Sequence, residues 1–482
     1  MTFLAAAKIL SVIVGIVGTT FIIPIITALC YGEYNVILSF AIPMFVSWIL
    51  ALIFLIAGRK KTLTLTTRSS YVIVALGWIF ASLFGAIPFY ASSTVSSITD
   101  AVFESVSGFT TTGSSIFTDV ENLPKSILLW RCQSLWLGGM GIVALTVALL
   151  PLLGVGGFQL IKAETTGPEK GKITPKITTT AKVLWFIYFG LTLTQVLCLL
   201  FAKVNFVDAL SIAFATLGSG GFSNLNESIG GYNSSAVEWI CIVFMFLSGV
   251  NFTMYFYLIS KRFSDIRKNS ELRAYLLIII FSTLAICLFE RSNFGGFFKS
   301  LKNSAFQVIS IITTTGFSTS DYTLWSSASQ TIIFLLFFIG GCSGSTAGGV
   351  KVIRWVILGK QFNNEARKLL HPRGVFSIQL DGHPGSKRVI FSVAAFFYLY
   401  LILVALTTFA GTIFGQLDLF TAFSAALSMV GNVGPAFGKL GPSCNYAFLP
   451  AILKWCYCFS MLAGRLELYT MVIFFLPSYW KK

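Results

Sequence analysis

The chain alternates long apolar segments with short clusters of charge, and this alternation predicts its architecture. A helix needs about 20 apolar residues to cross a bilayer. Nine segments carry no charged residue: 9–32, 34–58, 69–99, 132–161, 183–202, 239–260, 274–289, 322–350 and 389–417. A tenth apolar stretch, residues 440–480, is interrupted by Lys454, Arg465 and Glu467. We therefore expect an all-α polytopic membrane protein with about ten transmembrane helices.

The charges between these segments are mainly basic, which predicts the orientation of the helices. Most of the 34 Lys and Arg residues lie near the two ends of the chain or in four loops, at residues 59–68, 162–182, 261–273 and 351–388. Cytoplasmic loops of membrane proteins carry an excess of Lys and Arg. We therefore place these loops and both termini in the cytoplasm of a multi-pass protein.

The composition agrees with this interpretation and excludes several function classes. The chain is 55% hydrophobic and 11% charged, whereas soluble domains carry about a quarter charged residues. The net charge of +16 lies between apolar spans rather than on a phosphate-binding face, so lipid and not nucleic acid is the expected partner. Nine cysteines without a CxxC pair and two isolated histidines suggest neither a metal centre nor a catalytic cluster. No enzymatic activity and no tightly bound cofactor are expected.

Four glycine turns recur along the chain with a fixed internal spacing. They are Thr111-Thr112-Gly113, Ser219-Gly220-Gly221, Thr314-Thr315-Gly316 and Asn432-Val433-Gly434. A polar residue stands thirteen positions before each final glycine: Asp100, Asp208, Asn303 and Thr421. The intervening stretches are too short to span, so we expect half-helices that enter from outside, are capped by these polar residues and point their negative dipole ends at a central cation. The carbonyls before each glycine would then line a selectivity filter for potassium.

The spacing of the turns divides the chain into four quasi-equivalent units, each built as helix, pore helix, filter turn and helix around one pore. The expected divisions are a two-helix extension at residues 1–69 and pore repeats at residues 70–181, 182–270, 271–385 and 386–482. The third repeat is expected to have a broken second helix. Glu104, inside the first half-helix, is expected to be a structural hydrogen-bond partner behind the filter.

A glycine-rich stretch interrupts the second helix of the third repeat. Its small and polar residues cannot sustain an ordinary membrane helix; they are Gly340, Gly341, Ser343, Gly344, Ser345, Thr346, Gly348 and Gly349. A flexible loop lying across the pore below the third turn, acting as a gate, is the favoured interpretation. Tight helix packing through small residues is the alternative. A phosphate-binding loop is disfavoured because the GxxxxGK[ST] spacing is absent.

Arg465 lies halfway along the otherwise apolar final segment. An arginine at the bilayer centre costs about 2.5–3.5 kcal/mol on insertion scales, so it should face water or a partner. We expect it to project into the pore below the filter as an electrostatic barrier to cations. An ion pair with Glu467 or Glu104, or snorkelling to the inner face, is the alternative.

At these residues the chain resembles the TrkH/TrkG group of bacterial potassium uptake proteins, within the Trk/Ktr/HKT superfamily. The resemblance covers the whole chain, including residues 103–108 (FESVSG), residues 432–435 (NVGP), the glycine-rich stretch and Arg465. It implies a homodimer in the bacterial inner membrane, with one pore per protomer. It also implies a cytosolic ring partner of the TrkA type, whose nucleotide-binding domains dock on the basic loops. Gly113 implies potassium rather than sodium as the transported ion.

These observations predict potassium uptake through a channel-like selective pore that a glycine loop and an arginine gate and that a cytosolic partner regulates. An ion-coupled potassium symporter with alternating access, driven by protons or sodium, is the alternative. Broken helices and a midplane arginine also mark such carriers. Four turns in the same orientation favour the pore. The second turn and Ala436, at a position expected to be glycine, depart from the resemblance and bear on fine selectivity.

Overall fold

The computed structural model describes residues 3–58, 67–141, 177–374, 376–381, 383–384, 387–472 and 477–480. Within these ranges the chain is built almost entirely of helices, with one two-stranded antiparallel ladder of two residues per strand. The predicted all-α membrane architecture is confirmed. The basic loop at residues 59–66 and the predicted span beyond residue 141 lie outside the described residues.

In the part of the chain that the structure describes, six helical spans are long and apolar enough to cross a membrane: Ala6–Tyr31, Tyr34–Ala57, Ser69–Ala91, Ala181–Phe201, Ser270–Phe289 and Arg388–Gly415. Each coincides with one of the predicted charge-free segments. Their outer faces are apolar and exposed, as at Leu38 and Ile42, which are 65% and 58% exposed. An exposed apolar surface of this length is typical of contact with lipid.

The helices before the first turn and of the first repeat are α1 (Phe3–Thr20), α2 (Ile22–Tyr31), α3 (Tyr34–Ala57), α4 (Thr67–Gly85), α5 (Ile87–Ala91), α6 (Ile98–Phe109) and α7 (Lys125–Gly139). Next come α10 (Ile177–Phe201), α11 (Phe206–Leu217), η2 (Ser228–Tyr232), α12 (Ser235–Ser248), α13 (Phe252–Ile259) and α14 (Phe263–Lys268). They are followed by α15 (Ser270–Phe289), α16 (Phe297–Ile312), η3 (Tyr322–Leu324), α17 (Ser327–Leu336), α18 (Val352–Leu370), β1 (Gln379–Leu380) and β2 (His383–Pro384). The last are α19 (Lys387–Gly415), α20 (Leu419–Gly431), η4 (Gly438–Leu440), α21 (Ala451–Arg465), α22 (Tyr469–Val472) and α23 (Pro477–Trp480).

Four short helices, α6, α11, α16 and α20, precede the glycine turns, and we call them the pore helices. They have 12, 12, 16 and 13 residues. At 1.5 Å per residue the shortest extends about 18 Å, well below the 30 Å hydrocarbon core. The half-helices expected from the sequence are therefore present, each ending at its turn.

The prediction that Asp100, Asp208, Asn303 and Thr421 cap these helices is wrong. The capping side chains lie earlier in two of them: Asn205 accepts the N–H of Asp208, and Asp418 accepts the N–H of Thr421. The N-cap positions of α6 and α16 are Ser97 and Gly296, neither with a capping side chain. Asn303 lies inside α16 because that helix begins at Phe297, a full turn and more before it.

The second helix of each predicted repeat is short or broken. The segment predicted as one span over residues 239–260 is two helices, α12 and α13, bent by 91°. The segment over residues 322–350 ends as a helix at Leu336, and α18 begins only at Val352, so the expected break is present. Likewise α7 ends at Gly139 and α21 at Arg465, after 15 residues each. Straight crossings are thus replaced by helices that stop inside the bundle.

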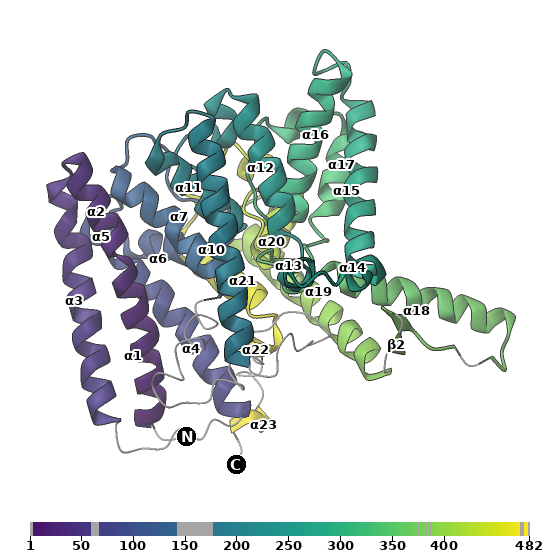
Figure 1. Cartoon of the computed structure of the whole chain (residues 1–482), viewed down its shortest axis with the longest axis horizontal. Helices are drawn as coiled ribbons and strands as arrows, with labels where there is room; N and C mark the ends of the chain where they lie inside the picture. Colours follow the sequence, from purple (N-terminus) through teal and green to yellow (C-terminus); the bar gives the residue numbers. More distant parts are fainter. Residues whose placement is uncertain are drawn as a thin grey trace.

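The N-terminal helices α1 to α3 pack against one side of the four-unit bundle, on the left in Figure 1. The turn between α2 and α3 also reaches the pore region, because Glu33 accepts hydrogen bonds from Ser126 N–H and Oγ at 3.0 and 2.6 Å. This carboxylate satisfies free amides at the start of α7, as an N-cap does. The start of α1 and the short helix α23 lie at the bottom of the same view.

Helix α18 projects from the bundle, at the right in Figure 1. The ladder of β1 and β2 packs against its first turns through a small apolar cluster, in which Ile378 and Leu380 contact Ile353 and Ile357. The glycine-rich stretch before α18 is thereby joined directly to this projecting part of the molecule.

Candidate cation pore

The four glycine turns share one backbone conformation. The residue two positions before the final glycine is left-handed in every turn, with φ of 58° at Thr111, 55° at Ser219, 54° at Thr314 and 54° at Asn432. The final glycines are also left-handed, with φ of 78°, 72°, 80° and 103°. A left-handed residue that carries a side chain costs about 1–2 kcal/mol. A cost repeated in all four turns indicates a functional constraint rather than an accident of packing.

Backbone hydrogen bonds fix the direction of the carbonyl groups in each turn. The N–H of Thr112 donates to the carbonyl of Ser107 at 2.9 Å, inside the pore helix. The equivalent bonds are Gly220 to Ala215, Thr315 to Ser310 and Val433 to Ser428, at 3.0, 2.8 and 2.9 Å. In a trans peptide the C=O points opposite to the N–H. The carbonyls of residues 111, 219, 314 and 432 therefore point away from their own pore helices.

The final glycines place the four turns in a closed ring. A methyl group added to Gly113 would overlap the carbonyl oxygen of Gly220, and the same holds between Gly221 and Thr315 and between Gly316 and Val433. On Gly434 it would lie 2.5 Å from the carbonyl oxygen of Thr112. Each glycine thus faces the next turn in chain order, and the last faces the first. Only a residue without Cβ allows this approach.

A cavity of about 150 Å³ opens on the side where the chain leaves the turns. All four final glycines line it, with polar groups of the following loops such as Ser115 and Asn226. Its volume admits several water molecules. A small ion could therefore reach the ring partly hydrated.

The departures of the second and fourth turns leave the ring geometry unchanged. The second turn, with Gly220 in place of a threonine, keeps the left-handed positions and the return hydrogen bonds of the others. Ala436 is buried, and its carbonyl accepts a hydrogen bond from the Tyr322 hydroxyl at 2.6 Å. With alanine at residue 436, the fourth turn keeps the left-handed positions of the others.

A buried ion pair supports the first turn from behind. The Nε of Arg131 lies 2.7 Å from the Glu104 carboxylate, with side-chain exposures of 1% and 0%. Glu104 also accepts the N–H of Ile116 at 2.9 Å, and Arg131 donates to the carbonyl of Ser223 at 3.1 Å. The pair therefore joins the segments that follow the first and second turns. Glu104 is a structural hydrogen-bond partner behind the filter, as the sequence predicts. The sequence does not reveal that Arg131 is the other member of the pair.

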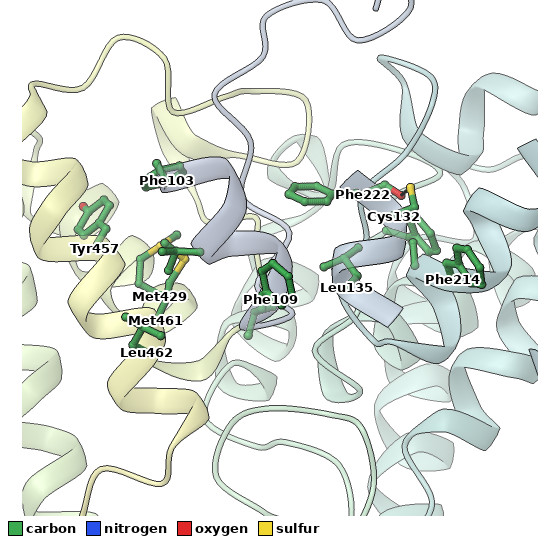
Figure 2. Packing of buried hydrophobic residues seen from close by; sticks show 14 of the residues in the cluster. Phe103, Phe109, Cys132, Leu135, Phe214, Phe222, Met429, Tyr457, Met461 and Leu462 are labelled. Atoms are coloured by element: carbon green, nitrogen blue, oxygen red, sulfur yellow. Dashed lines mark hydrogen bonds between the residues drawn. The ribbon is translucent and has the colours of Figure 1, made fainter. Parts of the chain in front are cut away.

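Apolar side chains fill the space between the pore helices and the helices that follow them (Figure 2). Phe103, Phe109, Leu135, Met429 and Met461 are fully buried there. Leu135 packs directly on Gly220, where a methyl group would overlap its side chain. Close-packed interiors resist local shifts, so the turns are held by a rigid surrounding.

The glycine-rich stretch at residues 340–349, here called the glycine loop, lies against the second and third turns. The N–H of Gly348 donates to Thr314 Oγ1 at 2.6 Å, and Thr346 Oγ1 lies 2.7 Å from Ser219 Oγ. The loop also fits into the bend of the second repeat, because Cys342 N–H donates to Gly249 O at 2.9 Å.

The other loop residues close the loop on itself or tie it to neighbours. Gly340 N–H donates to Val350 O at 2.9 Å, which joins the two ends. Gly341 O accepts the N–H of Val352 at 3.2 Å, and Ser345 Oγ donates to Cys342 O at 2.6 Å. Gly344 and Gly349 are left-handed, with φ of 72° and 67°. The Ser343 N–H donates at 2.6 Å to Glu271 Oε1, an acceptor that the sequence did not reveal.

Arg465 connects the glycine loop to the end of α7. Its guanidinium donates to Thr346 O at 2.9 Å, to Gly138 O at 2.6 Å and to Gly139 O at 2.9 Å. Glu104 and Glu467, the alternative partners considered from the sequence, pair with Arg131 and Arg354. Arg465 thus bonds carbonyl groups of the loop and of the first repeat, below the ring.

Comparison with known proteins decides the family. The model of the TrkH family, described as a cation transport protein, matches residues 38–482. The chain belongs to the TrkH family. As an integral membrane protein of this family it is a transporter and not an enzyme, as the sequence predicted.

Curated members of the TrkH family and its close relatives match along nearly the whole chain. The Trk system potassium uptake protein TrkH of Halomonas elongata is 37% identical over 480 residues, covering 98% of each chain. TrkH of Escherichia coli K12 is 36% identical over 488 residues and covers 100% of both, and TrkG of the same strain is 35% identical over 95% of this chain and 94% of its own. The resemblance to the TrkH/TrkG group is therefore confirmed.

A solved TrkH structure has the same fold. The crystal structure of the potassium transporter TrkH from Vibrio parahaemolyticus matches with a TM-score of 0.88 and 32% identity, covering 100% of both chains. Identity at this level over the full length supports the architecture of four units and an N-terminal extension.

Proposed function

We propose that this TrkH-family chain takes up potassium across the bacterial inner membrane through a channel-like selective pore. The closed ring of four glycine turns carries this proposal. Carbonyls that point away from their pore helices and meet around one axis are the means by which a protein replaces the hydration shell of K⁺. We propose potassium as the ion because the relatives are named Trk system potassium uptake proteins. The rival mechanism is symport driven by protons or sodium, and the experiment must distinguish it from passive flow through a channel-like pore.

The glycine loop and Arg465 are proposed as the gate. The loop lies directly below the second and third turns, and it is held there by individual hydrogen bonds to Thr314 and Ser219 rather than by a continuous helical ladder. Arg465 holds the loop through Thr346 O and adds a positive charge on the path of the ion. Opening requires the glycine loop to move out of the pore. The Arg465 guanidinium then either moves with the loop or breaks its hydrogen bond to Thr346 O.

Regulation by a cytosolic nucleotide-binding ring of the TrkA type, and assembly as a homodimer with one pore per protomer, complete the proposal. Helix α18 begins three residues after the glycine loop and projects from the bundle with exposed Arg367 and Lys368. A partner that binds this basic helix would pull directly on the loop. Nucleotide chemistry is assigned to that partner.

Rubidium tracer uptake into liposomes that hold the purified chain tests the function. We expect uptake down the rubidium gradient without a proton or sodium gradient, blocked by K⁺ and poorly by Na⁺. Dependence of uptake on an imposed proton or sodium gradient would favour the symporter. If the wild-type chain is silent alone, Arg465→Ala should restore flux because it removes the barrier and one loop anchor, while Arg465→Lys, which keeps the charge, should restore less. Silence in all of these chains would contradict a channel-like pore.

A further inference from the structure

Two of the four glycine turns use the glycine loop as a hydrogen-bond partner. Ser219 and Thr314 occupy the same left-handed position in the second and third turns, and both side chains are buried, at 0% and 1% exposure. Ser219 Oγ meets Thr346 Oγ1 at 2.7 Å, and Thr314 Oγ1 accepts the N–H of Gly348 at 2.6 Å. The loop therefore touches the ring itself and not only the path below it.

The equivalent residues of the other two turns are held differently. Asn432 donates from Nδ2 to Met461 O at 2.9 Å and to Thr112 Oγ1 at 3.0 Å, so the fixed helix α21 and the first turn hold it. Thr111 Oγ1 is buried and has no hydrogen-bond partner among the described residues. Anchorage by a movable segment is thus confined to the second and third turns.

Thr346 is the residue on which these contacts converge. Its side chain is fully buried and, besides Ser219, lies 3.2 Å from the carbonyl oxygen of Ser248, while its own carbonyl accepts from Arg465. Gly348 packs tightly against the fourth turn as well, since a methyl group there would lie 2.6 Å from Gly431 O. The closed loop forms the floor of three turns.

We infer that the glycine loop is a positioning element of the selectivity filter, and that Thr346 couples gating to ion discrimination. When the loop leaves, Thr314 loses the N–H of Gly348, and Ser219 loses the Thr346 hydroxyl and keeps only its bond to Ser248 Oγ at 3.2 Å. Their backbone meanwhile stays in a conformation that side chains disfavour. The carbonyls of these two turns then adjust more freely, and discrimination by a fixed ring falls. This inference rests on the proposed function, because it concerns selectivity of the same pore.

The test compares ion binding to the purified, non-transporting chain, in which the loop is closed, in Thr346 variants and in the wild-type chain. The readout is the K⁺ or Na⁺ concentration that gives half of the maximal rise in melting temperature. Thr346→Val keeps the shape and removes the hydroxyl. We expect the ratio of the Na⁺ and K⁺ concentrations to fall about fivefold, the factor to which the loss of one hydrogen bond of about 1 kcal/mol corresponds. Thr346→Ser, which keeps the hydroxyl, should restore the ratio.

Thr331→Val is the matched control. Thr331 is an exposed threonine of α17 whose hydroxyl bonds the carbonyl four residues before it, away from the ring. The ratio of the Na⁺ and K⁺ concentrations for Thr331→Val should equal that of the wild-type chain. A wild-type ratio in a folded Thr346→Val chain would overturn the inference and leave the loop as a gate alone. If Thr346→Val does not accumulate, Thr346→Ala gives the same decision, because it removes the same hydroxyl with a smaller side chain. Failure of the proposed function would instead appear as wild-type chain that transports no rubidium under any of the conditions above.

Discussion

At the scale of single residues, the ring depends on two kinds of position that alternate in each turn. The final glycine lets the next turn approach to a distance that any Cβ would block. The residue two places earlier carries a side chain in the left-handed region and reaches a hydrogen-bond partner in three of the four turns. Close approach and side-chain anchorage together set where the carbonyls stand.

Gly113→Ser should reduce the discrimination of K⁺ against Na⁺. The added Cβ would overlap the carbonyl oxygen of Gly220, so the first two turns must separate and their carbonyls move. We expect the Na⁺ to K⁺ competition ratio in rubidium uptake to fall by about tenfold, which corresponds to about 1.4 kcal/mol of lost discrimination. Gly190→Ser is the matched control, because a Cβ on Gly190 of α10 meets nothing within 4 Å. An unchanged ratio in a folded Gly113→Ser chain would argue against a filter at this ring.

At the scale of elements, one buried carboxylate ties the glycine loop to the first turn of α18. Glu271 Oε1, at the start of α15, accepts the N–H of Ser343 at 2.6 Å and that of Ile353 at 3.1 Å. The preceding residue, Ser270, donates its N–H to Asp381 of the β1–β2 ladder at 2.8 Å. A short chain of hydrogen bonds thus leads from the ladder, through the start of α15, to the loop.

Glu271→Ala should increase rubidium uptake by loosening the closed loop. The substitution leaves two buried N–H groups without their acceptor, at a cost of about 1–3 kcal/mol each to the closed arrangement. When the loop leaves the pore, water can accept hydrogen bonds from these N–H groups. The open arrangement therefore does not bear this free-energy cost. Glu271→Gln retains an acceptor oxygen at the same place and should behave nearly as the wild-type chain does. Lower uptake in a well-folded Glu271→Ala chain, with normal uptake in Glu271→Gln, would contradict a gating role for the loop.

Elements whose residue types repeat along the chain can be predicted from the sequence. Features that depend on the direction of the backbone, or on side chains that meet from distant parts of the chain, cannot. The four turns were found because Gly113 and its three equivalents recur at one offset. The start of α16 was misplaced because Asn303 follows a mixed apolar and basic run, from Phe297 onward, that is itself helical. The bend of 91° after Ser248 was missed because an apolar segment reports burial in lipid and not backbone direction. In the sequence, Arg131 stands only at the edge of an apolar run. Its pairing with Glu104 is not visible there, because Glu104 lies in another helix.

At the scale of the whole molecule, the arrangement of exposed cysteines allows the orientation to be tested on native residues, without introducing new cysteines. Cys30, at the end of α2, and Cys444, beside the cavity over the ring, are the two exposed cysteines, and the other seven are buried or half-buried. From the basic loops we expect both on the outer face of the membrane. The start of α1 and the short helix α23 lie at the same end of the bundle (Figure 1), as the expected orientation requires.

A membrane-impermeant maleimide should label Cys30 and Cys444 in intact cells whose outer membrane has been opened. Cys30→Ser and Cys444→Ser should each remove one of the two labelled sites. Modification of Cys444 should also lower rubidium uptake, because this residue lines the entrance cavity, whereas modification of Cys30 should leave uptake unchanged. Labelling that requires lysis of the inner membrane would reverse the proposed orientation.

The contact between the last and the first turn also sets the order in which the molecule is completed. Ser114 Oγ donates to Gly434 O at 2.9 Å across 320 positions of the chain. At about 5–20 residues per second of synthesis, the first turn waits roughly 15–60 s in the membrane for this partner. A polypeptide released early by the ribosome therefore has no closed ring, and the bacterium acquires an ion pathway only when the final helices have been inserted.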